Sequence, residues 1–349
     1  MNDPQRSSAL PADIERAVEL LRAGELVAFP TETVYGLGAD ARNPEAVAKI
    51  FAAKGRPTDH PLIVHIGEIS HLEHWARDIP EVARVLARAF WPGPLTLILK
   101  RQPDVPDAVT GGQDSVGLRM PNHPVALELL RAFADATGGA GNGLAAPSAN
   151  RFGRISPTTA QHVRDDLGAA VSLILDGGPC TVGIESTIVD LTGPRTVILR
   201  PGMLSPFDIG RLLGRMPEMA DNPLAPRTTP RASGSLEAHY APRTPLQIMP
   251  NDSLPIVLRD ALVRREHVAV LATFPAPFDH PLISWQVAPA DPAGFARELY
   301  ANLRKLDSLG CARMYIEKLV GPPWQAVTDR LKRAAAGSGG ERTLPQGHP

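Results

Sequence analysis

The chain has 349 residues, 43% of them hydrophobic and 21% charged, a composition typical of an ordinary globular protein and unlike that of a fibrous or disordered one. Its 36 Lys and Arg residues nearly balance its 37 Asp and Glu residues, so no overall positive charge drives tight, sequence-independent binding to nucleic acid. The length favours two domains, each able to bury its own core.

The cysteines and the N-terminal residues point to a reducing compartment. Cys180 and Cys311 are far apart and match no zinc-ligand spacing, so neither a disulfide framework nor a zinc site is expected. The first residues, MNDPQRSSALPADIERA, contain no apolar signal core, and no segment approaches the ~18 uninterrupted apolar residues of a membrane span. We therefore expect a cytoplasmic protein that does not enter a membrane.

Helices and strands alternate along the first 214 residues. Helical spacing of apolar residues and typical start and stop residues predict helices over 11–23, 44–54, 125–138, 158–168 and 205–214. Runs rich in β-branched residues predict strands over 25–33, 61–66, 115–121, 144–150, 171–178, 186–192 and 196–202, and the stretch 79–100 is predicted to be helix, turn and strand. This mixture predicts an α/β fold with a twisted, mixed sheet and flanking helices over 1–214.

A proline-rich stretch follows this region. Residues 215–244 show almost no periodicity, and we expect a linker that is either disordered or functional. Beyond it, strands are predicted over 267–274 and 312–319 and helices over 291–310 and 324–336, which gives a small βαβ-type domain over 245–337. The glycine-rich tail, 338–349, is expected to be disordered.

Common catalytic motifs are missing from the sequence. It contains no G-x-x-x-x-G-K-[ST] loop and no G-x-G-x-x-G, because GLGAD supplies only two of the three glycines. Ser148, in APSAN, lacks the G-x-S-x-G elbow of many serine hydrolases. Covalent catalysis by a serine is therefore disfavoured.

What remains is a set of cationic and small polar groups near the ends of predicted elements. Lys54 and Arg56 flank Gly55 after a helix, so an anion can approach the backbone while two positive side chains reach it. The alternative is a solvated helix C-terminus, which the helix dipole favours. Arg119 interrupts an apolar strand, so it either belongs to a site or simply faces water. His65 lies within another apolar strand and is either a ligand-binding group or a hydrogen-bonded histidine of the core.

These groups indicate a site because the fold can bring them close together. Ligands of α/β sheets bind beyond the carboxyl ends of strands, and such ends can hold Thr31, Thr33, Arg56, His65, Arg119, Ser148, Ser186 and Arg200. Taken singly, the hydroxyl residues are equally typical of capped turns. Together, three arginines and Lys54 would form an anion pocket, and the residues alone predict a nucleotide or polyphosphate plus a small metabolite.

Seven motifs, in order, resemble those of a known family. They are PTETVYGLGADA, KGRPTDHPLIVHI, WPGPLTLIL, VGLRMP, APSAN, ESTIVD and LRPG, and they cover residues 10–210 densely. They resemble the threonylcarbamoyl-AMP synthases, in the long Sua5 form of the Sua5/YciO/YrdC family. The segment HYAPRTPL resembles the linker of that form, and LYANLRKLDSLG with TDRLKRAA resembles its small Rossmann-like C-terminal domain.

The resemblance implies a nucleotidyltransferase that converts ATP, L-threonine and bicarbonate to threonylcarbamoyl-adenylate and pyrophosphate, with Mg²⁺ carried by ATP and no protein-bound metal. A separate transferase complex would then modify the adenosine 3′ to the anticodon in tRNAs that read ANN codons. No membrane contact and no tight nucleic-acid binding are implied.

The resemblance also implies roles for individual residues. Threonine would be held by Thr33, His65, Arg119, Ala146 and Ser186. ATP would be held by Arg56, His60, Ser115, Ser148, Asn150, Arg200 and Tyr240, the last closing over the site from the linker. Lys54 and Arg56 would neutralise phosphate charge during catalysis.

His60 departs from the family pattern, which usually has asparagine at this position. A neutral imidazole donates or accepts a hydrogen bond but cannot do both at one place as an amide does. The departure predicts an altered or pH-dependent affinity for the nucleotide.

Three other functions fit parts of the sequence. A non-catalytic module of this fold could bind double-stranded RNA or tRNA, although the balanced charge and 5% aromatic content disfavour it. A carbamoyl-transfer enzyme of the hydrogenase-maturation type would carry accessory zinc-finger cysteines. A YciO-like paralogue would lack synthase activity.

Overall fold

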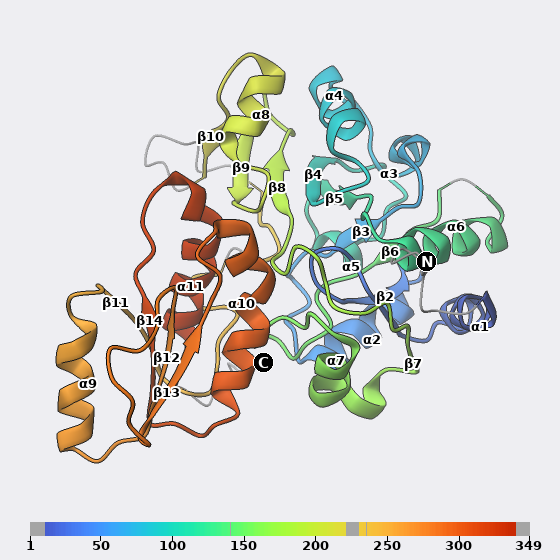
Figure 1. Cartoon of the computed structure of the whole chain (residues 1–349). Helices are drawn as coiled ribbons and strands as arrows, with labels where there is room; N and C mark the ends of the chain where they lie inside the picture. The colour runs from blue at the N-terminus through green and yellow to red at the C-terminus, as the bar shows by residue number, and fades with distance from the viewer. Residues whose placement is uncertain (1–10, 140, 221–229, 235, 340–349) are drawn as a thin grey trace, which may run out of the picture. The chain divides into compact units, whose positions relative to one another are not determined.

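A computed structural model of the chain describes residues 11–139, 141–220, 230–234 and 236–339 (Figure 1). These residues form two compact units: one contains 11–152 and 156–234, and the other contains 153–155 and 236–339. The first unit is built on a ten-stranded mixed sheet and the second on a four-stranded parallel sheet. The predicted α/β class, with a mixed sheet and a smaller second sheet, is confirmed.

The large sheet has the strand order β10-β9-β8-β4-β5-β3-β6-β2-β1-β7. Its strands are β1 (Val27–Phe29), β2 (Gly36–Asp40), β3 (Ile63–His65), β4 (Leu95–Lys100), β5 (Ser115–Arg119), β6 (Leu144–Ala145), β7 (Leu173–Ile174), β8 (Thr187–Asp190), β9 (Val197–Arg200) and β10 (Glu218–Met219). Parallel and antiparallel pairs mix at the centre, where β5 runs parallel to β3 and antiparallel to β4. Carboxyl and amino ends of neighbouring strands therefore meet at the same edge.

The two faces of this sheet differ in chemistry. Successive residues of a strand point to opposite faces, so each strand supplies alternate side chains to each layer. One face carries the main apolar core, including Ala28, Leu37, Val64, Leu97, Leu99, Val116, Leu118, Ala145, Val189 and Ile198. The opposite face carries two smaller apolar clusters and, as described below, most of the predicted site residues.

Helices of the first unit are α1 (Pro11–Arg22), α2 (Pro44–Lys54), α3 (Leu72–Trp75), α4 (Glu81–Phe90), α5 (Asp107–Thr110), α6 (Pro124–Ala136), α7 (Ala160–Leu167) and α8 (Pro206–Leu213), with short 3₁₀ turns at Ile69–His71 and Gly168–Ala170. Helices α1 and α6 lie side by side (Figure 1) and share an apolar cluster with β1. Helix α2 begins at the N-cap Asn43, whose side chain accepts from the N–H groups of Glu45 and Ala46, and ends at the left-handed Gly55. These caps fix where Lys54 and Arg56 leave the helix.

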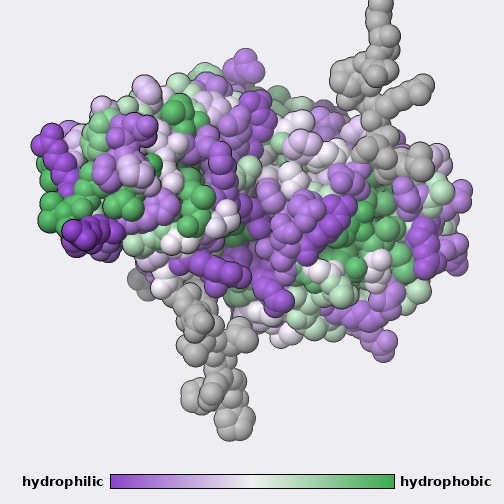
Figure 2. All heavy atoms as spheres, turned by 60° about the horizontal axis from the view of Figure 1, so that its bottom comes forward, coloured by the Kyte–Doolittle hydropathy of each residue, from purple (hydrophilic) through white to green (hydrophobic). Residues whose placement is uncertain are grey.

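The second unit contains β11 (Leu246–Met249), β12 (Val268–Ala272), β13 (Ile283–Val287) and β14 (Arg313–Glu317) in the order β11-β14-β12-β13. Helix α9 (Leu254–Val263) covers one face, and α10 (Pro292–Asp307) and α11 (Gln325–Gly337) cover the other; a 3₁₀ turn spans Pro322–Trp324 (Figure 1). Helix α9 leaves Ile256 and Val263 exposed, and green residues interrupt the hydrophilic surface at the left end of Figure 2.

The stretch predicted as a linker, 215–244, is divided between the units. Its residues 221–229 and 235 lie outside the described residues. Of the remainder, Glu218–Met219 form β10 beside β9, residues 230–234 belong to the first unit, and 236–244 belong to the second. The tail predicted to be disordered, 338–349, is described only for Ser338 and Gly339. No helix within the described ranges is long and apolar enough to cross a membrane.

Candidate functional site

Most predicted site residues share one face of the large sheet rather than one edge. His65 pairs with Arg119, Ile63 with Gly117, and Ile188 with Arg200, and paired residues point to the same face. His65, Arg119 and Arg200 do end β3, β5 and β9, but Ser186 precedes β8. The prediction that the groups gather at strand carboxyl ends is therefore only partly right, because the sheet is mixed.

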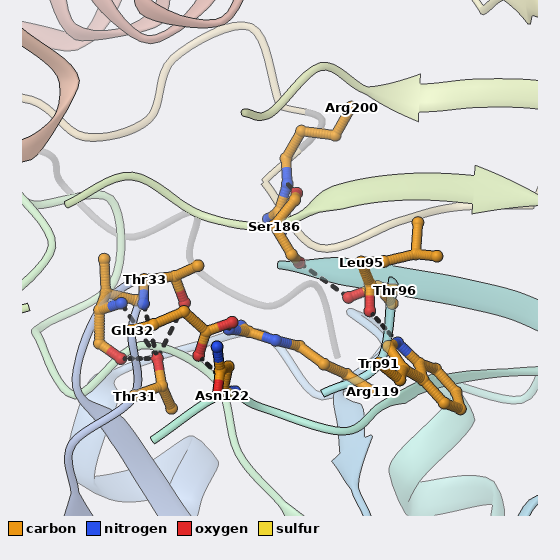
Figure 3. Close-up of polar contacts among 11 residues, drawn as sticks. Thr31, Glu32, Thr33, Trp91, Leu95, Thr96, Arg119, Asn122, Ser186 and Arg200 are labelled. Carbon is orange, nitrogen blue, oxygen red and sulfur yellow. Dashed lines mark hydrogen bonds and ion pairs between the residues drawn. The ribbon is translucent and has the colours of Figure 1, made fainter. Parts of the chain in front are cut away.

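The turn after β1 is organised by Thr31. Its hydroxyl donates to the carbonyl of Val34 at 2.7 Å, accepts from the N–H groups of Thr33 and Val34, and lies 2.8 Å from the hydroxyl of Thr33. Both threonines are fully buried (Figure 3). The hydroxyl of Thr31 thus fixes the side chain of Thr33, while Thr31 itself has the capping role that was the simpler alternative.

Arg119 does not face water; it forms a buried ion pair with Glu32. Its Nη2 donates to Glu32 Oε1 at 2.7 Å, and both side chains are 5% exposed. The other oxygen, Oε2, accepts from the backbone N–H of Asn122 at 3.0 Å (Figure 3). The Nε of Arg119 is also buried and has no hydrogen-bond partner among the residues that the structure describes. Because a buried donor without a partner costs about 1–3 kcal/mol, this N–H is suited to a ligand oxygen.

His65 is neutral in the folded protein. Burial and the positive charge of Arg119 lower the pKa of His65 to about 3. Its Nδ1 lies 3.3 Å from the carbonyl oxygen of Ile63, and its ring packs edge-on against Phe29. An uncharged imidazole of this kind offers one hydrogen bond to a substrate, which is compatible with both of the predicted alternatives.

Lys54 is buried rather than solvated, so the alternative of an open helix C-terminus is wrong for it. Its ammonium donates to the carbonyl oxygens of Ser148 and Asn150. Burial, and secondarily the charge of Arg56, holds the pKa of Lys54 well below its usual range. In this structure Lys54 holds the turn of APSAN in place, and Ser148 also bridges to Gly36 of β2.

Arg56 and Arg200 both contact the segment 231–233. Arg56 Nη2 donates to the carbonyl of Pro61 at 3.0 Å and to the hydroxyl of Ser233 at 3.1 Å. Arg200 Nη1 donates to the carbonyl of Ser233 at 2.9 Å, and its other nitrogens donate to the hydroxyl and carbonyl of Ser186, each at 3.1 Å. Two of the predicted phosphate-binding residues are thereby brought together.

A narrow cavity lies beside this segment. Its lining includes Ile63, Ser115, Gly117, Ala232 and Ser233, so the predicted ATP-binding Ser115 faces the same space as the segment. Ala232 packs against the second apolar cluster of the site face, with Ile63, Ile98, Ile188, Val197 and Leu199.

His60 is half-buried beside Phe152. Its ring packs edge-on against Phe152 at 5.5 Å, and Arg56 also lies over that ring. Burial, and then the nearby charge of Arg56, lowers the pKa of His60. The imidazole is therefore uncharged at neutral pH.

Two further predicted residues lie on or near β6. Ala146 follows β6 and donates its N–H to the carbonyl of Ile63 at 3.0 Å. Asn150 is buried, and its Nδ2 donates to the carbonyl of Arg151 at 2.7 Å. These contacts fix Ala146 beside β3 and hold Asn150 within its own turn.

Tyr240, predicted to close over the nucleotide, belongs to the second unit. There its ring lies 5.7 Å from that of Tyr300, and the guanidinium of Arg330 lies 5.3 Å from its centre. Its φ of 61° is in the left-handed region, which a residue with a side chain rarely adopts. The contact of Tyr240 with ATP stays a prediction.

Sequence reasoning missed Glu32, Thr96 and Ser233. The hydroxyl of Thr96 lies 2.7 Å from that of Ser186 (Figure 3). Glu32 carried one signal, a charge inside a stretch of buried residues, but its partner lies 87 positions away. Ser233 lies in a segment without periodicity. Within the described residues, no group of three or more His, Cys, Asp or Glu side chains could hold a metal ion.

Two family models match the chain. The Sua5/YciO/YrdC model, described as telomere recombination, matches residues 19–202. A second model, described as threonylcarbamoyl-AMP synthase, C-terminal domain, matches residues 207–336. The matches together span both units of the structure.

Individual relatives agree with these models. The threonylcarbamoyl-AMP synthase of Pyrococcus abyssi is 38% identical over 335 residues, which are 92% of this chain and 94% of the relative. The enzyme of the same name from Bacillus subtilis is 47% identical over 249 residues, 71% of this chain and 67% of the relative. The crystal structure of P. abyssi Sua5 complexed with L-threonine superposes with a TM-score of 0.83, at 36% identity, and covers 93% of this chain and 95% of that one. The chain thus belongs to the Sua5/YciO/YrdC family, in its two-domain Sua5 group of threonylcarbamoyl-AMP synthases.

Proposed function

We propose that this chain synthesises L-threonylcarbamoyl-adenylate from L-threonine, bicarbonate and ATP, with release of pyrophosphate. The observation that carries the proposal is Arg119, a buried guanidinium that pairs with Glu32 between Thr31 and Thr33 and whose Nε lacks a hydrogen-bond partner within the described part of the chain. A guanidinium with a free N–H is suited to the carboxylate of an amino acid. The related P. abyssi protein has been crystallised with L-threonine.

The amino-acid side of the site is assigned to residues around β3 and β5. Arg119 would bind the carboxylate of threonine, and Thr33, neutral His65 and Ser186 would offer hydrogen bonds to its polar groups. Ala146 would contact its carbon atoms. All five side chains are buried, so water is largely excluded from this side.

The nucleotide side is assigned to the region where Arg56 and Arg200 meet. The two guanidinium groups would bind phosphate oxygens, with Ser115, Ser148, Asn150 and His60 around the nucleotide and Tyr240 as a further contact. A triphosphate would have to displace or rearrange Ser233, which now accepts from both arginines. Lys54 would act on the phosphates through the turn 148–150 that it holds.

The reaction requires positioning rather than a protein nucleophile. The amine of threonine attacks the carbon of bicarbonate and a water leaves, which gives N-carboxythreonine. Its new carboxylate oxygen attacks the α-phosphorus of ATP, the bond to the β-phosphate oxygen breaks, and pyrophosphate leaves. Arg56 and Arg200 would neutralise the charge that develops on phosphate oxygens. Mg²⁺ would arrive with ATP as part of the substrate.

The product is a mixed anhydride that a second enzyme must consume. We assign that role to a threonylcarbamoyl transferase complex, which would modify the adenosine 3′ to the anticodon in tRNAs reading ANN codons. This fate and the bicarbonate substrate are parts of the proposal that follow from the family resemblance, and the cytoplasmic location is proposed from the cysteine usage.

One assay tests the proposal. Purified protein receives ATP, Mg²⁺, bicarbonate and labelled threonine, and pyrophosphate is measured with and without threonine. Threonine-dependent pyrophosphate with a labelled adenylate is the expected result. No threonine-dependent pyrophosphate would contradict the synthase, and tight RNA binding without turnover would favour the non-catalytic RNA-binding alternative.

Two substitutions test the residue roles. Arg56→Ala and Arg119→Ala should each lower turnover by at least about tenfold, because each removes a charge-assisted hydrogen bond to a substrate anion. Part of the loss should also appear as a raised KM, for ATP in the first variant and for threonine in the second. Unchanged kinetics in both variants would show that the roles are misassigned.

A further inference from the structure

Glu32 is fixed at the centre of the site face by contacts on both ends of its carboxylate. Oε1 accepts from Arg119 at 2.7 Å and Oε2 accepts from the N–H of Asn122 at 3.0 Å (Figure 3). Its own backbone carbonyl accepts from the N–H of Val182 at 2.7 Å. Glu32 therefore cannot move without breaking contacts to two segments, the end of β5 with its following turn (119–122) and the segment of Val182.

These contacts also fix the guanidinium of Arg119. The residue ends β5, and its Nη2 is held by a carboxylate that is itself anchored. The plane of the guanidinium is rigid, so holding one nitrogen directs the others. The Nε, which has no partner in the described ranges, is thereby presented in a fixed direction for a ligand.

The pair also sets the charge of this part of the site. Arg119 is positive and Glu32 negative at a separation of 2.7 Å, with both side chains out of water, so their sum is close to zero. The adjacent His65 is uncharged, as its lowered pKa indicates. Arg56 and Arg200, the two predicted phosphate-binding arginines, donate to oxygens of Pro61, Ser186 and Ser233.

We propose that Glu32 is a positioning and specificity-determining residue. It orients Arg119 for a carboxylate and cancels its charge, so that this subsite accepts a net-neutral α-amino acid and rejects free phosphate. The inference rests on the proposed function, in which threonine and ATP both carry anionic groups. It explains how the two substrates are kept in separate parts of one site. A phosphate dianion near the Glu32 carboxylate would be repelled, whereas a zwitterion carries a compensating ammonium.

Glutamine at this position is a sharp test, because Glu32 accepts on both oxygens. One end of a glutamine amide is a donor, so it would face either the N–H of Arg119 or the N–H of Asn122. Glu32→Gln thus removes both the charge and one of the two contacts. Glu32→Asp keeps the charge and both acceptors on a shorter side chain.

The experiment measures binding of L-threonine to the full-length chain by calorimetry, alone and in the presence of inorganic phosphate. For Glu32→Gln we expect the Kd of threonine to rise at least about tenfold and phosphate to compete with threonine, since the subsite is now net positive. For Glu32→Asp we expect weaker binding without phosphate competition. In turnover assays, the KM for threonine should rise in Glu32→Gln, while the KM for ATP stays within about twofold.

Glu317→Gln is the matched control. Glu317 is a buried carboxylate of the second unit that accepts from the N–H and hydroxyl of Thr273 and from Asn251. The variant Glu317→Gln removes a buried negative charge, as Glu32→Gln does, but should leave the Kd of threonine unchanged. A similar rise in both variants would mean that general destabilisation is the cause and would overturn the role of Glu32.

The remaining outcomes are separable. If Glu32→Gln binds threonine as the unaltered chain does and phosphate does not compete, the role of Glu32 is wrong. If Glu32→Gln does not fold, judged by circular dichroism, Glu32→Asp decides: phosphate competition in it would overturn the role. If the unaltered chain binds threonine but releases no pyrophosphate, the proposed function fails while the role of Glu32 stands; if it binds no threonine, both fail.

Discussion

Charged side chains in the site are buried and held by specific partners. Arg119 rests on Glu32, and Lys54 rests on the carbonyls of the turn 148–150. Removing one partner of such a buried ion pair typically costs about 3–5 kcal/mol, because the other charge stays behind unpaired. At this scale the site is a set of charges whose positions are determined before any substrate arrives.

His65 provides a prediction about stability and pH. Its folded pKa of about 3 lies below the ordinary value near 6.5, so the unfolded chain takes up a proton between these values that the folded chain does not. The free energy of unfolding should therefore fall by about 2 kcal/mol between pH 7 and pH 5 on account of this group. Urea titrations at both pH values measure this fall. In His65→Asn the fall between pH 7 and pH 5 should be smaller by about 2 kcal/mol, because the titrating group is gone. Equal losses in the two proteins would contradict it.

His60 provides a prediction about the nucleotide. Its pKa is lowered by burial and by Arg56, so at pH 7.5 it is neutral and offers a single hydrogen bond. We expect His60→Asn to lower the KM for ATP by about two- to fivefold at pH 7.5, because an amide donates and accepts together. As the pH falls toward the lowered pKa of His60, the imidazole gains a charge that attracts phosphate, and the difference from His60→Asn should narrow. A KM ratio that stays constant from pH 7.5 down to the lowest pH at which both proteins remain folded would rule this out.

At the residue scale, several residues that the sequence singled out do share one face of the large sheet, but their contacts were not predicted. Arg119 was recognisable because an arginine in an apolar strand breaks the period of two. Its partner Glu32 was not, since pairing between positions 87 apart depends on the order of β1, β3 and β5 in the sheet. The roles of Lys54 and Ser233 likewise depend on turns from distant segments.

Helix α2 is the element that sets the cationic side of the site. Its N-terminus is fixed by Asn43 and its C-terminus by Gly55, whose φ is 62°. Lys54 is the last residue of the helix, and Arg56 follows the glycine. A change in either cap would be transmitted to both side chains.

The N-cap gives a prediction for this element. Asn43→Ala removes the acceptor for the N–H groups of Glu45 and Ala46, which lie 3.0 and 3.2 Å away. The free energy of unfolding should fall by about 1 kcal/mol, measured by urea denaturation of the first unit. Asn43→Asp keeps an oxygen acceptor and places a negative charge at a helix N-terminus, so it should lose little. Equal losses in the two variants would show that the cap is not responsible.

At the element scale, most elements of the first unit were predicted, and the misses are concentrated in the second unit and in segments without a clear apolar pattern. Helices α1, α2, α6, α10 and α11 lie where apolar periodicity placed them. Strand β2 was missed because GLGAD contains no β-branched residue, although Gly38 permits close packing against Phe29. Strands β11 and β13 and helix α9 were also missed. For α9 a usable signal existed in the spacing of Leu254, Leu258 and Ala261, all buried.

The whole molecule consists of two units whose boundary lies near residue 235. The first unit includes segment 231–233, which the sequence predicted as part of a linker. Arg231 pairs with Asp59, its N–H donates to the side chain of Gln113, and its Nη2 donates to the carbonyl of Gly111. The segment is therefore part of the packing of the first unit.

Truncation tests this boundary. A chain ending at residue 235 keeps the contacts of Arg231 and Ser233, whereas a chain ending at 214 loses them together with β10. We expect the shorter chain to have a lower Tm and to lose activity, because Ala232 no longer covers apolar side chains of the site face. The longer chain should keep the Tm of the first unit. Equal melting temperatures for both truncations would place the boundary at 214 instead.

The division of the large sheet into an apolar face and a site face has a consequence for mutational scanning. Neighbouring residues of one strand are constrained by different requirements. In β5, Val116 and Leu118 pack in the core and affect stability, while Ser115 and Arg119 face the site and affect activity. If the variants are scored for protein abundance in cells, substitutions along β3, β4 and β5 should be poorly tolerated at every second position. If the same variants are scored for turnover, substitutions at the positions between should be poorly tolerated as well.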